Sequence, residues 1–239
     1  MFYSHDFEVY YSDVDKDNRL KVCSLFNIFQ EMGCMHSDYA GYGLKDIPNT
    51  HVAWLVTNWK AQIIRYPSWN EKIHVVTWSR HEDSIYAYRD FEVLDENNNM
   101  IAKCSSKWVL VNTETGRLEK LSSTIADSFE PESKQVFNNP IDRLKEPTNS
   151  TTVFSYKVLR RDIDTNKHMN NNNYLQIALE ALPENNVSAP ISFVEIMYKH
   201  PAMLGDTISC LYYKNKENEQ IITLKSEDLS KLFAIVKLS

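Results

Sequence analysis

The sequence predicts an α+β protein in which one unit, a long helix followed by antiparallel strands, is built twice. An apolar helical face near residue 25 precedes four strand-like segments, and the same succession restarts near residue 152. The stretches 11–31 and 160–180 also align without gaps at an offset of 149 residues, so that their loops and helix starts coincide. One helix over an antiparallel sheet, made twice, is an α+β architecture.

The elements of the first half follow from periodicity and turn residues. We expect a short strand at 7–11 and then a helix that Ser24 caps, which runs to Tyr39 and ends before two glycines. Clusters of Asn and Asp, or a proline, separate the strands that follow. Their expected ranges are 53–66, 72–80, 85–94 and 100–111.

The second half repeats this order. A strand is expected at 152–159, then a polar loop, then a helix that Asn173 caps and that Pro183 prevents from continuing. Its apolar positions recur at helical spacing and are Tyr174, Ile177, Ala178 and Ala181. The expected strands after it span 191–199, 207–213, 220–225 and 232–238.

A polar segment with three prolines, residues 129–150, predicts a linker between the halves. The expected domains are therefore 1–128 and 151–239. A sheet that wraps a single central helix is the hot-dog fold, so the prediction is a tandem (double) hot dog.

Composition narrows the class of protein. The chain has 239 residues, of which 43% are apolar and 12% aromatic, and can bury a proper core. No leader peptide is read, and no apolar run approaches the ~20 residues of a membrane span. Four isolated cysteines are typical of reduced thiols, so we expect a cytoplasmic protein, and the net charge of −6 argues against non-specific nucleic-acid binding.

No metal site is predicted. Asp13, Asp15 and Asp17 alternate as in a calcium loop, but that loop needs glycine at its sixth position and glutamate at its twelfth. Asn18 and Ser24 stand there instead. The seven histidines do not group at the spacing of zinc ligands.

The candidate catalytic residues are Asp164, Asn166 and His168, at alternate positions just before the second helix. A carboxylate, a carboxamide and an imidazole thus converge on a helix N-terminus, where backbone N–H groups can bind an oxyanion. An imidazole is suited to take a proton from water. Asp164 could orient His168, act as the base itself, or attack an acyl carbon, and all three roles stay open.

The first copy lacks this triplet. Asp17 and Arg19 stand where the second copy has Asn166 and His168. An arginine stays protonated and cannot accept a proton from water. We therefore expect chemistry in the C-terminal copy only.

Residues 162–183, DIDTNKHMNNNNYLQIALEALP, are similar to the D-x-D-x-N-x-H-x-N-N-x-x-Y segment of the acyl–acyl carrier protein thioesterases of plants and bacteria. Residues 25–41 and 54–78 resemble that family's first hot-dog helix and the two strands after it. The resemblance implies a catalytic triplet, acyl carrier protein as the partner, and no cofactor beyond the phosphopantetheine of the substrate.

One position departs from the family pattern. Family members often carry a Y-x-x-E segment after the histidine, and here Tyr198 is followed by Pro201 in place of the glutamate. Any role of that carboxylate is absent or has moved, for example to Glu195.

Two further sets of side chains are predicted to contact the substrate. A basic collar, for the acidic carrier that the resemblance implies, would consist of Arg160, Arg161, Lys167 and Lys199. The acyl chain would lie against Phe29, Met32 and Trp54. The alternatives are an ordinary solvated charge face and simple core packing.

The expected function is a fatty acyl–acyl carrier protein hydrolase, which releases free fatty acids and so ends chain elongation. An acyl-CoA thioesterase, a dehydratase of the same fold and a non-catalytic lipid-binding protein are the alternatives. The asparagine between Asp164 and His168 favours hydrolysis over dehydration. A monomer and a homodimer are both compatible with the sequence, because two hot-dog domains fused in one chain already provide the usual pairing of such domains.

Overall fold

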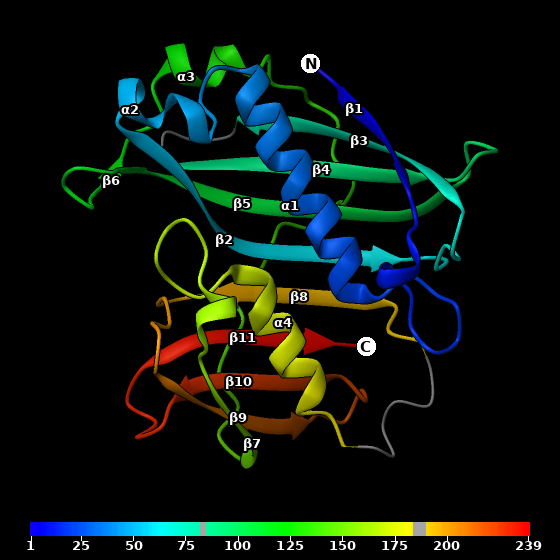
Figure 1. Cartoon of the computed structure of the whole chain (residues 1–239), viewed down its shortest axis with the longest axis vertical. Coiled ribbons are helices and arrows are strands. Elements are labelled where there is room, and N and C mark those ends of the chain that lie inside the picture. The colour runs from blue at the N-terminus through cyan, green and yellow to red at the C-terminus, as the bar shows by residue number, and fades with distance from the viewer. Residues whose placement is uncertain (82–84, 184–189) are drawn as a thin grey trace. The chain divides into compact units, whose positions relative to one another are not determined.

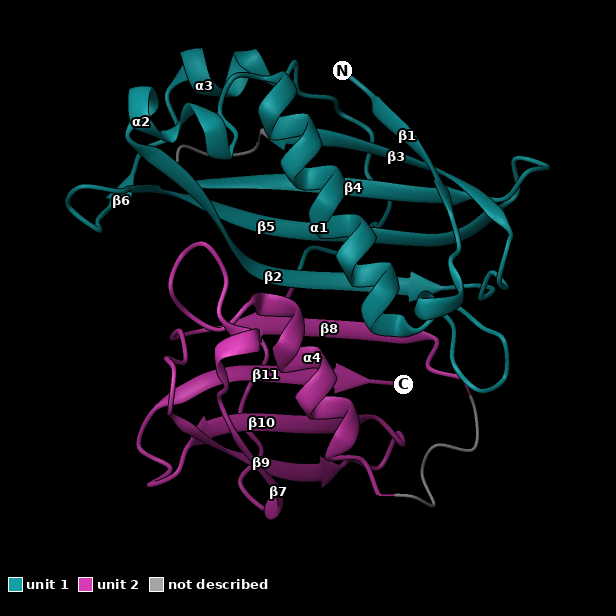
Figure 2. Ribbon diagram, in the orientation of Figure 1, with its two compact units in different colours: residues 1–141 teal, residues 142–239 magenta. Residues whose placement is uncertain are grey.

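The computed structural model describes residues 1–81, 85–183 and 190–239. The chain divides into two compact units, Met1–Ile141 and Asp142–Ser239 (Figure 2). Each unit places one long helix against an antiparallel sheet (Figure 1), which confirms the predicted α+β fold of two hot-dog copies. Among the described helices, none has the length and apolar character needed to cross a membrane.

Unit 1 has the sheet order β1-β3-β4-β5-β2, with antiparallel neighbours and a short β6 on β5. Its strands are β1 (Tyr3–Glu8), β2 (Val52–Ile63), β3 (Lys72–His81), β4 (Tyr86–Leu94), β5 (Met100–Asn112) and β6 (Leu118–Glu119). Its helices are α1 (Val22–Tyr39), α2 (Ile47–Thr50) and α3 (Ser123–Ser128), with 3₁₀ turns η1 (Tyr11–Asp13) and η2 (Leu44–Asp46).

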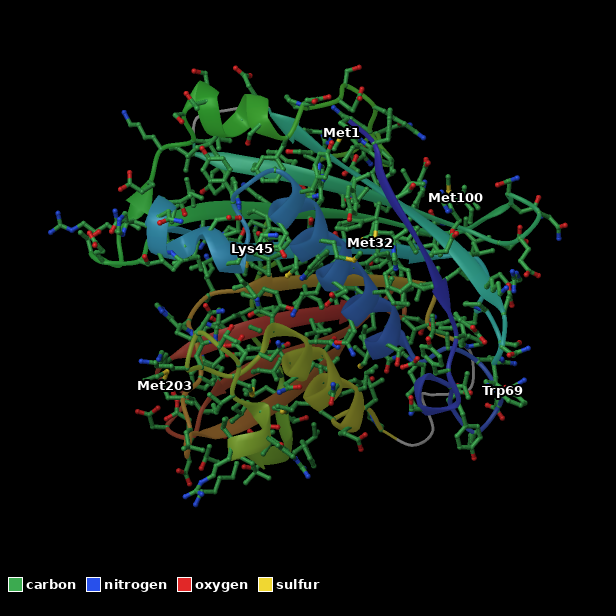
Figure 3. The ribbon with its side chains drawn as sticks, turned by 45° about the horizontal axis from the view of Figure 1, so that its top comes forward. Met1, Met32, Lys45, Trp69, Met100 and Met203 are labelled. Carbon is green, nitrogen blue, oxygen red and sulfur yellow. The ribbon has the colours of Figure 1, made fainter. Side chains whose placement is uncertain are left out.

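The core of unit 1 lies between α1 and its sheet. Phe29 and Met32 are completely buried on one face of α1, where Figure 3 labels Met32. The Phe29 ring centre lies 5.1 Å from that of Phe91 and 6.3 Å from that of Trp59. Each fully buried side chain of this size contributes ~1.5–3 kcal/mol, so the apolar face fixes α1 on the sheet.

Two predicted starts in unit 1 are wrong. The first strand is Tyr3–Glu8 and not 7–11, because Tyr10 already belongs to the turn, where its N–H donates to Asp13 Oδ2 at 3.3 Å. Helix α1 begins at Val22, and Ser24 lies buried inside it instead of capping it.

Part of the predicted linker packs on unit 1. Trp78 Nε1 donates to Lys134 O at 2.7 Å, and Val136 N donates to Asp90 Oδ2 at 3.0 Å. The backbone of this polar segment finds its partners on the sheet of unit 1, which extends the unit to Ile141.

Unit 2 has the sheet order β8-β11-β10-β9-β7, again with antiparallel neighbours. Its elements are β7 (Thr151–Lys157), η3 (Arg160–Asp162), α4 (Asn171–Glu180), β8 (Phe193–Tyr198), β9 (Thr207–Lys214), β10 (Gln220–Ser226) and β11 (Leu232–Leu238). Helix α4 lies across this sheet (Figure 1) and buries Tyr174, Leu175, Ile177 and Ala178.

Candidate active site

A tight loop between η3 and α4 holds the predicted triplet. Ile163 and Met169 form an antiparallel bridge that closes the loop. Inside it, Asp164 N donates to His168 O at 3.0 Å, and Lys167 takes a positive φ of 64° at the tip. The turn therefore sets Asp164 and His168 opposite each other, which their spacing of four residues alone does not require.

Asp162 anchors this loop to the rest of unit 2. Its buried carboxylate accepts hydrogen bonds from Tyr156 OH at 2.8 Å and from Leu159 N at 2.7 Å. Its carbonyl oxygen accepts from Asn170 N at 2.8 Å and from Asn173 Nδ2 at 3.1 Å. Sequence reasoning gave this residue no role, although it is the first Asp of the motif.

The first copy has the same loop backbone. Val14 bridges Leu20, and Asp15 N donates to Arg19 O at 2.8 Å. Asn18 takes the positive φ, at 59°. Each of these positions lies 149 residues before its counterpart in the second loop, so the predicted duplication is present in backbone geometry.

The side chains of Asp164 and His168 lie near each other in this loop. Asp164 Oδ1 lies 4.0 Å from His168 Nδ1, and the two side chains are only 18% and 19% exposed. His168 Nδ1 also lies 3.0 Å from Met169 O. A carbonyl oxygen only accepts, so we assign the hydrogen to Nδ1, which leaves the lone pair of Nε2 for a proton from water.

Asn166 takes a different position from the one expected. Its backbone N–H donates to Asp164 Oδ1 at 2.8 Å, which fixes that carboxylate. Its side chain is exposed and makes no hydrogen bond within the described residues. The structure thus joins Asn166 to the pair through its backbone.

The start of α4 is partly closed to a ligand. Asn170, and not Asn173 as predicted, caps the helix, and its side chain accepts from Asn172 N at 2.9 Å. Asn173 N donates to Asn170 O at 3.0 Å. In the described chain, the N–H of Asn171 has no acceptor, so one donor stays available for an oxyanion.

The segment around Pro201, where the sequence departs from the family pattern, packs beside the loop. Met169 N donates to Ala202 O at 2.9 Å, and Ala202 N donates to Tyr174 OH at 2.8 Å. Burial raises the pKa of Tyr174 to about 12, so its hydroxyl stays neutral. Pro201 therefore stands directly before a residue that positions the loop.

The carboxylate of Glu195 forms an ion pair with a lysine on a neighbouring strand. It is buried on β8, where its Oε2 lies 2.5 Å from Lys237 Nζ on β11. Lys237 Nζ also lies 3.1 Å from Glu219 Oε1. This network occupies the carboxylate that the sequence offered as a substitute for the missing family glutamate.

The four residues of the predicted collar, Arg160, Arg161, Lys167 and Lys199, are all exposed on unit 2. Arg161 Nε lies 3.9 Å from Asp162 Oδ1. The other three make no ion pair with the described residues. Their charges are therefore available to a partner.

The predicted acyl-binding residues lie in unit 1. Phe29 and Met32 belong to its packed core, whereas Trp54 is half-buried beside a small cavity. Their contact with an acyl chain stays a prediction.

Two protein-family models match the chain, one in each half. The family model for the N-terminal domain of acyl-ACP thioesterases matches residues 1–129, and the model for the C-terminal domain matches residues 145–231. The chain belongs to the acyl-ACP thioesterase family. The second of these acyl-ACP thioesterase domains contains the whole loop with Asp164 and His168.

Curated acyl-ACP thioesterases are distant relatives. The chain is 25% identical to oleoyl-acyl carrier protein thioesterase 1 of Arabidopsis thaliana over 228 residues, 87% of this chain and 63% of that protein. It is 25% identical to the oleoyl-acyl carrier protein thioesterase of Coriandrum sativum over 255 residues, 99% of this chain and 65% of that protein. The chain thus spans less than two thirds of the length of these relatives.

Solved structures of acyl-ACP thioesterases share the fold. An acyl-ACP thioesterase from Bacteroides thetaiotaomicron is 23% identical with a TM-score of 0.90, and the match covers 99% of this chain and 96% of that one. The 12:0-ACP thioesterase from Umbellularia californica is 21% identical with a TM-score of 0.86, covering 100% and 96%.

Proposed function

We propose that this chain hydrolyses acyl thioesters of acyl carrier protein and releases free fatty acids. The observation that carries the proposal is the pair formed by Asp164 and His168, 4.0 Å apart in the half that matches the C-terminal domain of the family. A carboxylate near an imidazole is a general acid–base arrangement, and thioester hydrolysis requires one.

In the proposed mechanism, His168 Nε2 removes a proton from water while the water oxygen attacks the thioester carbon. The negative charge of Asp164 favours the imidazolium that forms. The oxyanion is expected to accept a hydrogen bond from the free N–H of Asn171. The C–S bond then breaks, and the imidazolium returns the proton to the leaving thiolate.

A direct attack by Asp164 is the competing mechanism. Its Oδ2 accepts no hydrogen bond from the described residues and could form an acyl-enzyme anhydride. A single turnover in H₂¹⁸O distinguishes the two. General base catalysis leaves ¹⁸O in the fatty acid only, whereas attack by Asp164 followed by water addition at its own carbonyl puts ¹⁸O into the enzyme.

The function is tested by thiol release from matched acyl-ACP and acyl-CoA substrates. We expect a higher kcat/KM on acyl-ACP, together with free fatty acid in equal amount to the free thiol. A higher kcat/KM on acyl-CoA would show that coenzyme A, and not acyl carrier protein, is the preferred carrier of the acyl group. No thiol release from either substrate would contradict hydrolysis altogether.

We expect the basic collar to dock the carrier. Arg160→Glu together with Arg161→Glu should lower kcat/KM on acyl-ACP by about 10-fold or more at low salt, because charge complementarity governs encounter. Higher salt should produce a smaller loss in the unmodified chain. The measurement is steady-state kinetics on acyl-ACP and on a short acyl-pantetheine thioester.

The matched control changes net charge equally at exposed lysines outside the collar. Lys145→Glu together with Lys216→Glu should leave kcat/KM on acyl-ACP nearly unchanged, since both side chains lie on unit 2 without an ion pair to described residues. An equal loss on acyl-ACP and on the pantetheine thioester would show that the collar variant damages the site instead of docking.

We also expect the first loop to perform no chemistry. Asp17→Ala and Arg19→Ala should each leave kcat within a few-fold of the unmodified chain, because both side chains are exposed and Arg19 cannot accept a proton. Hydrolysis rates and melting temperatures of both variants check this. A large loss of kcat in folded Arg19→Ala would move the active site to the first copy.

A further inference from the structure

Unit 1 buries an arginine that has no counterion among the described residues. Arg89 on β4 is only 6% exposed, and it pairs with no carboxylate in the part of the chain that the structure describes. The neighbouring Asp90 points to the other face of the sheet, where its Oδ2 lies 3.1 Å from Arg80 Nε. An uncompensated buried charge is costly, so this position favours an anion.

The groups around Arg89 do not neutralise it. Burial lowers the pKa of Arg89 to about 10, which keeps the guanidinium charged at neutral pH. Burial and the nearby Arg89 charge lower the pKa of His36 to about 3, so that ring is neutral. Burial also raises the pKa of the Cys34 thiol, which therefore carries no charge.

The hydrogen bonds of this cluster leave donors without acceptors. Arg89 Nη1 donates to His36 Nδ1 at 2.6 Å and reaches Thr77 Oγ1 at 3.5 Å. Arg89 Nε and Nη2 have no acceptor among the described residues. The indole Nε1 of Trp54 is also buried without a hydrogen-bond partner in the described chain. Unsatisfied donors around one positive charge are suited to a negatively charged acceptor.

Trp54 and Arg89 line the same small cavity. The cavity measures about 20 Å³, enough for one particle of about the size of water. Phe129 and Trp108 form aromatic walls, and the Arg89 guanidinium lies 5.6 Å from the centre of the Phe129 ring. The indole N–H of Trp108 is already satisfied, because it donates to Ser106 Oγ at 2.7 Å.

We propose that this cavity in unit 1 binds one monatomic anion, a halide ion, between the Arg89 guanidinium and the Trp54 N–H. A water molecule would accept the same hydrogen bonds but would leave the charge uncompensated. The site involves none of the residues of the hydrolytic loop, and it shares only Trp54 with the predicted acyl-binding residues.

The test uses the full chain at constant ionic strength, with sodium gluconate as an anion too large for the cavity. Replacing gluconate by bromide should raise the melting temperature along a saturable curve, whereas replacing it by formate, which has three heavy atoms, should not. Anomalous diffraction from a bromide-soaked crystal should place bromine between Arg89 and Trp54. A saturable response to formate equal to the response to bromide would contradict a site for one monatomic anion.

Three variants make the result specific. Arg89→Met should abolish the saturable response while keeping the melting temperature in gluconate, because it removes a buried charge. Trp54→Phe should weaken the apparent affinity by about 10-fold or more through loss of one charge-assisted hydrogen bond. Trp108→Phe is the matched control and should change affinity far less, since its N–H already has an acceptor.

Bromide density absent from the cavity, with only water in its place, would overturn the proposal. So would an Arg89→Met chain that responds to bromide as the unmodified chain does. If Arg89→Met does not fold, the two tryptophan variants still test the proposal. Equal bromide affinities of Trp54→Phe and Trp108→Phe would then overturn it.

Discussion

Replacing either Asp164 or His168 by alanine is expected to lower kcat on acyl-ACP by ~10²–10⁴-fold, the usual range for loss of a general base or of the charge that supports it. The side chains of Asp164 and His168 make few contacts that contribute to the stability of the fold. Asp164 Oδ1 accepts from Asn166 N, and His168 Nδ1 contacts Met169 O. Melting temperatures should therefore stay close to that of the unmodified chain. Single-turnover kinetics measure the chemical step free of product release.

The duplication supplies the matched controls. Asp15→Ala and Arg19→Ala remove side chains from the aligned positions of a loop with the same backbone bridge. We expect both to keep kcat within a few-fold, although they disturb the first loop much as the active-site variants disturb the second. If Asp164→Ala or His168→Ala keeps most of the wild-type kcat, the mechanism proposed for this pair is wrong.

Most strands could be predicted because their signal is local. Alternating apolar residues between turn clusters gave 72–80, 85–94 and 100–111, each within two residues of β3, β4 and β5. The repeat at an offset of 149 was equally visible, since loop and helix share one pattern. Such features depend on neighbours in the chain and need no tertiary contact.

Helix starts could not be predicted in this way. Four consecutive asparagines at 170–173 are all suitable caps by residue type. Asn170 becomes the cap because its N–H binds Asp162 O, a contact that only the folded loop creates. Likewise, Lys21 precedes α1 because its N–H donates to Asp13 O, which excludes Ser24 as the cap.

The candidate site was predictable in its residues and not in its geometry. Alternate spacing placed Asp164 and His168 together, but their 4.0 Å separation and the contact of His168 with Met169 O follow from the closed loop. The uncompensated charge of Arg89 was invisible for a related reason. An arginine within a strand pattern does not reveal that its neighbour Asp90 pairs with Arg80 on the other face of the sheet.

Asp162→Ala is expected to have the largest effect on stability among the residues near the site. The change leaves Leu159 N and Tyr156 OH without their acceptor, and hydrogen bonds to a charged group contribute ~1.5–3 kcal/mol each. We therefore expect the free energy of unfolding to fall by roughly 3–6 kcal/mol. Since this carboxylate holds the entry to the catalytic loop, kcat should also fall, by up to ~10²-fold through misplacement of the reacting groups.

Urea unfolding and hydrolysis rates of Asp162→Ala measure both effects, and the first copy again provides a control. Asp13 is the aligned residue, but it is only half-buried and accepts from Tyr10 N at a longer 3.3 Å. Asp13→Ala should thus cost well under half as much stability and leave kcat nearly unchanged. Tyr156→Phe removes one of the two donors to Asp162 and should have an intermediate effect on stability. Equal destabilisation by Asp13→Ala and Asp162→Ala, with kcat untouched in both, would show that the buried carboxylate does not position the catalytic loop.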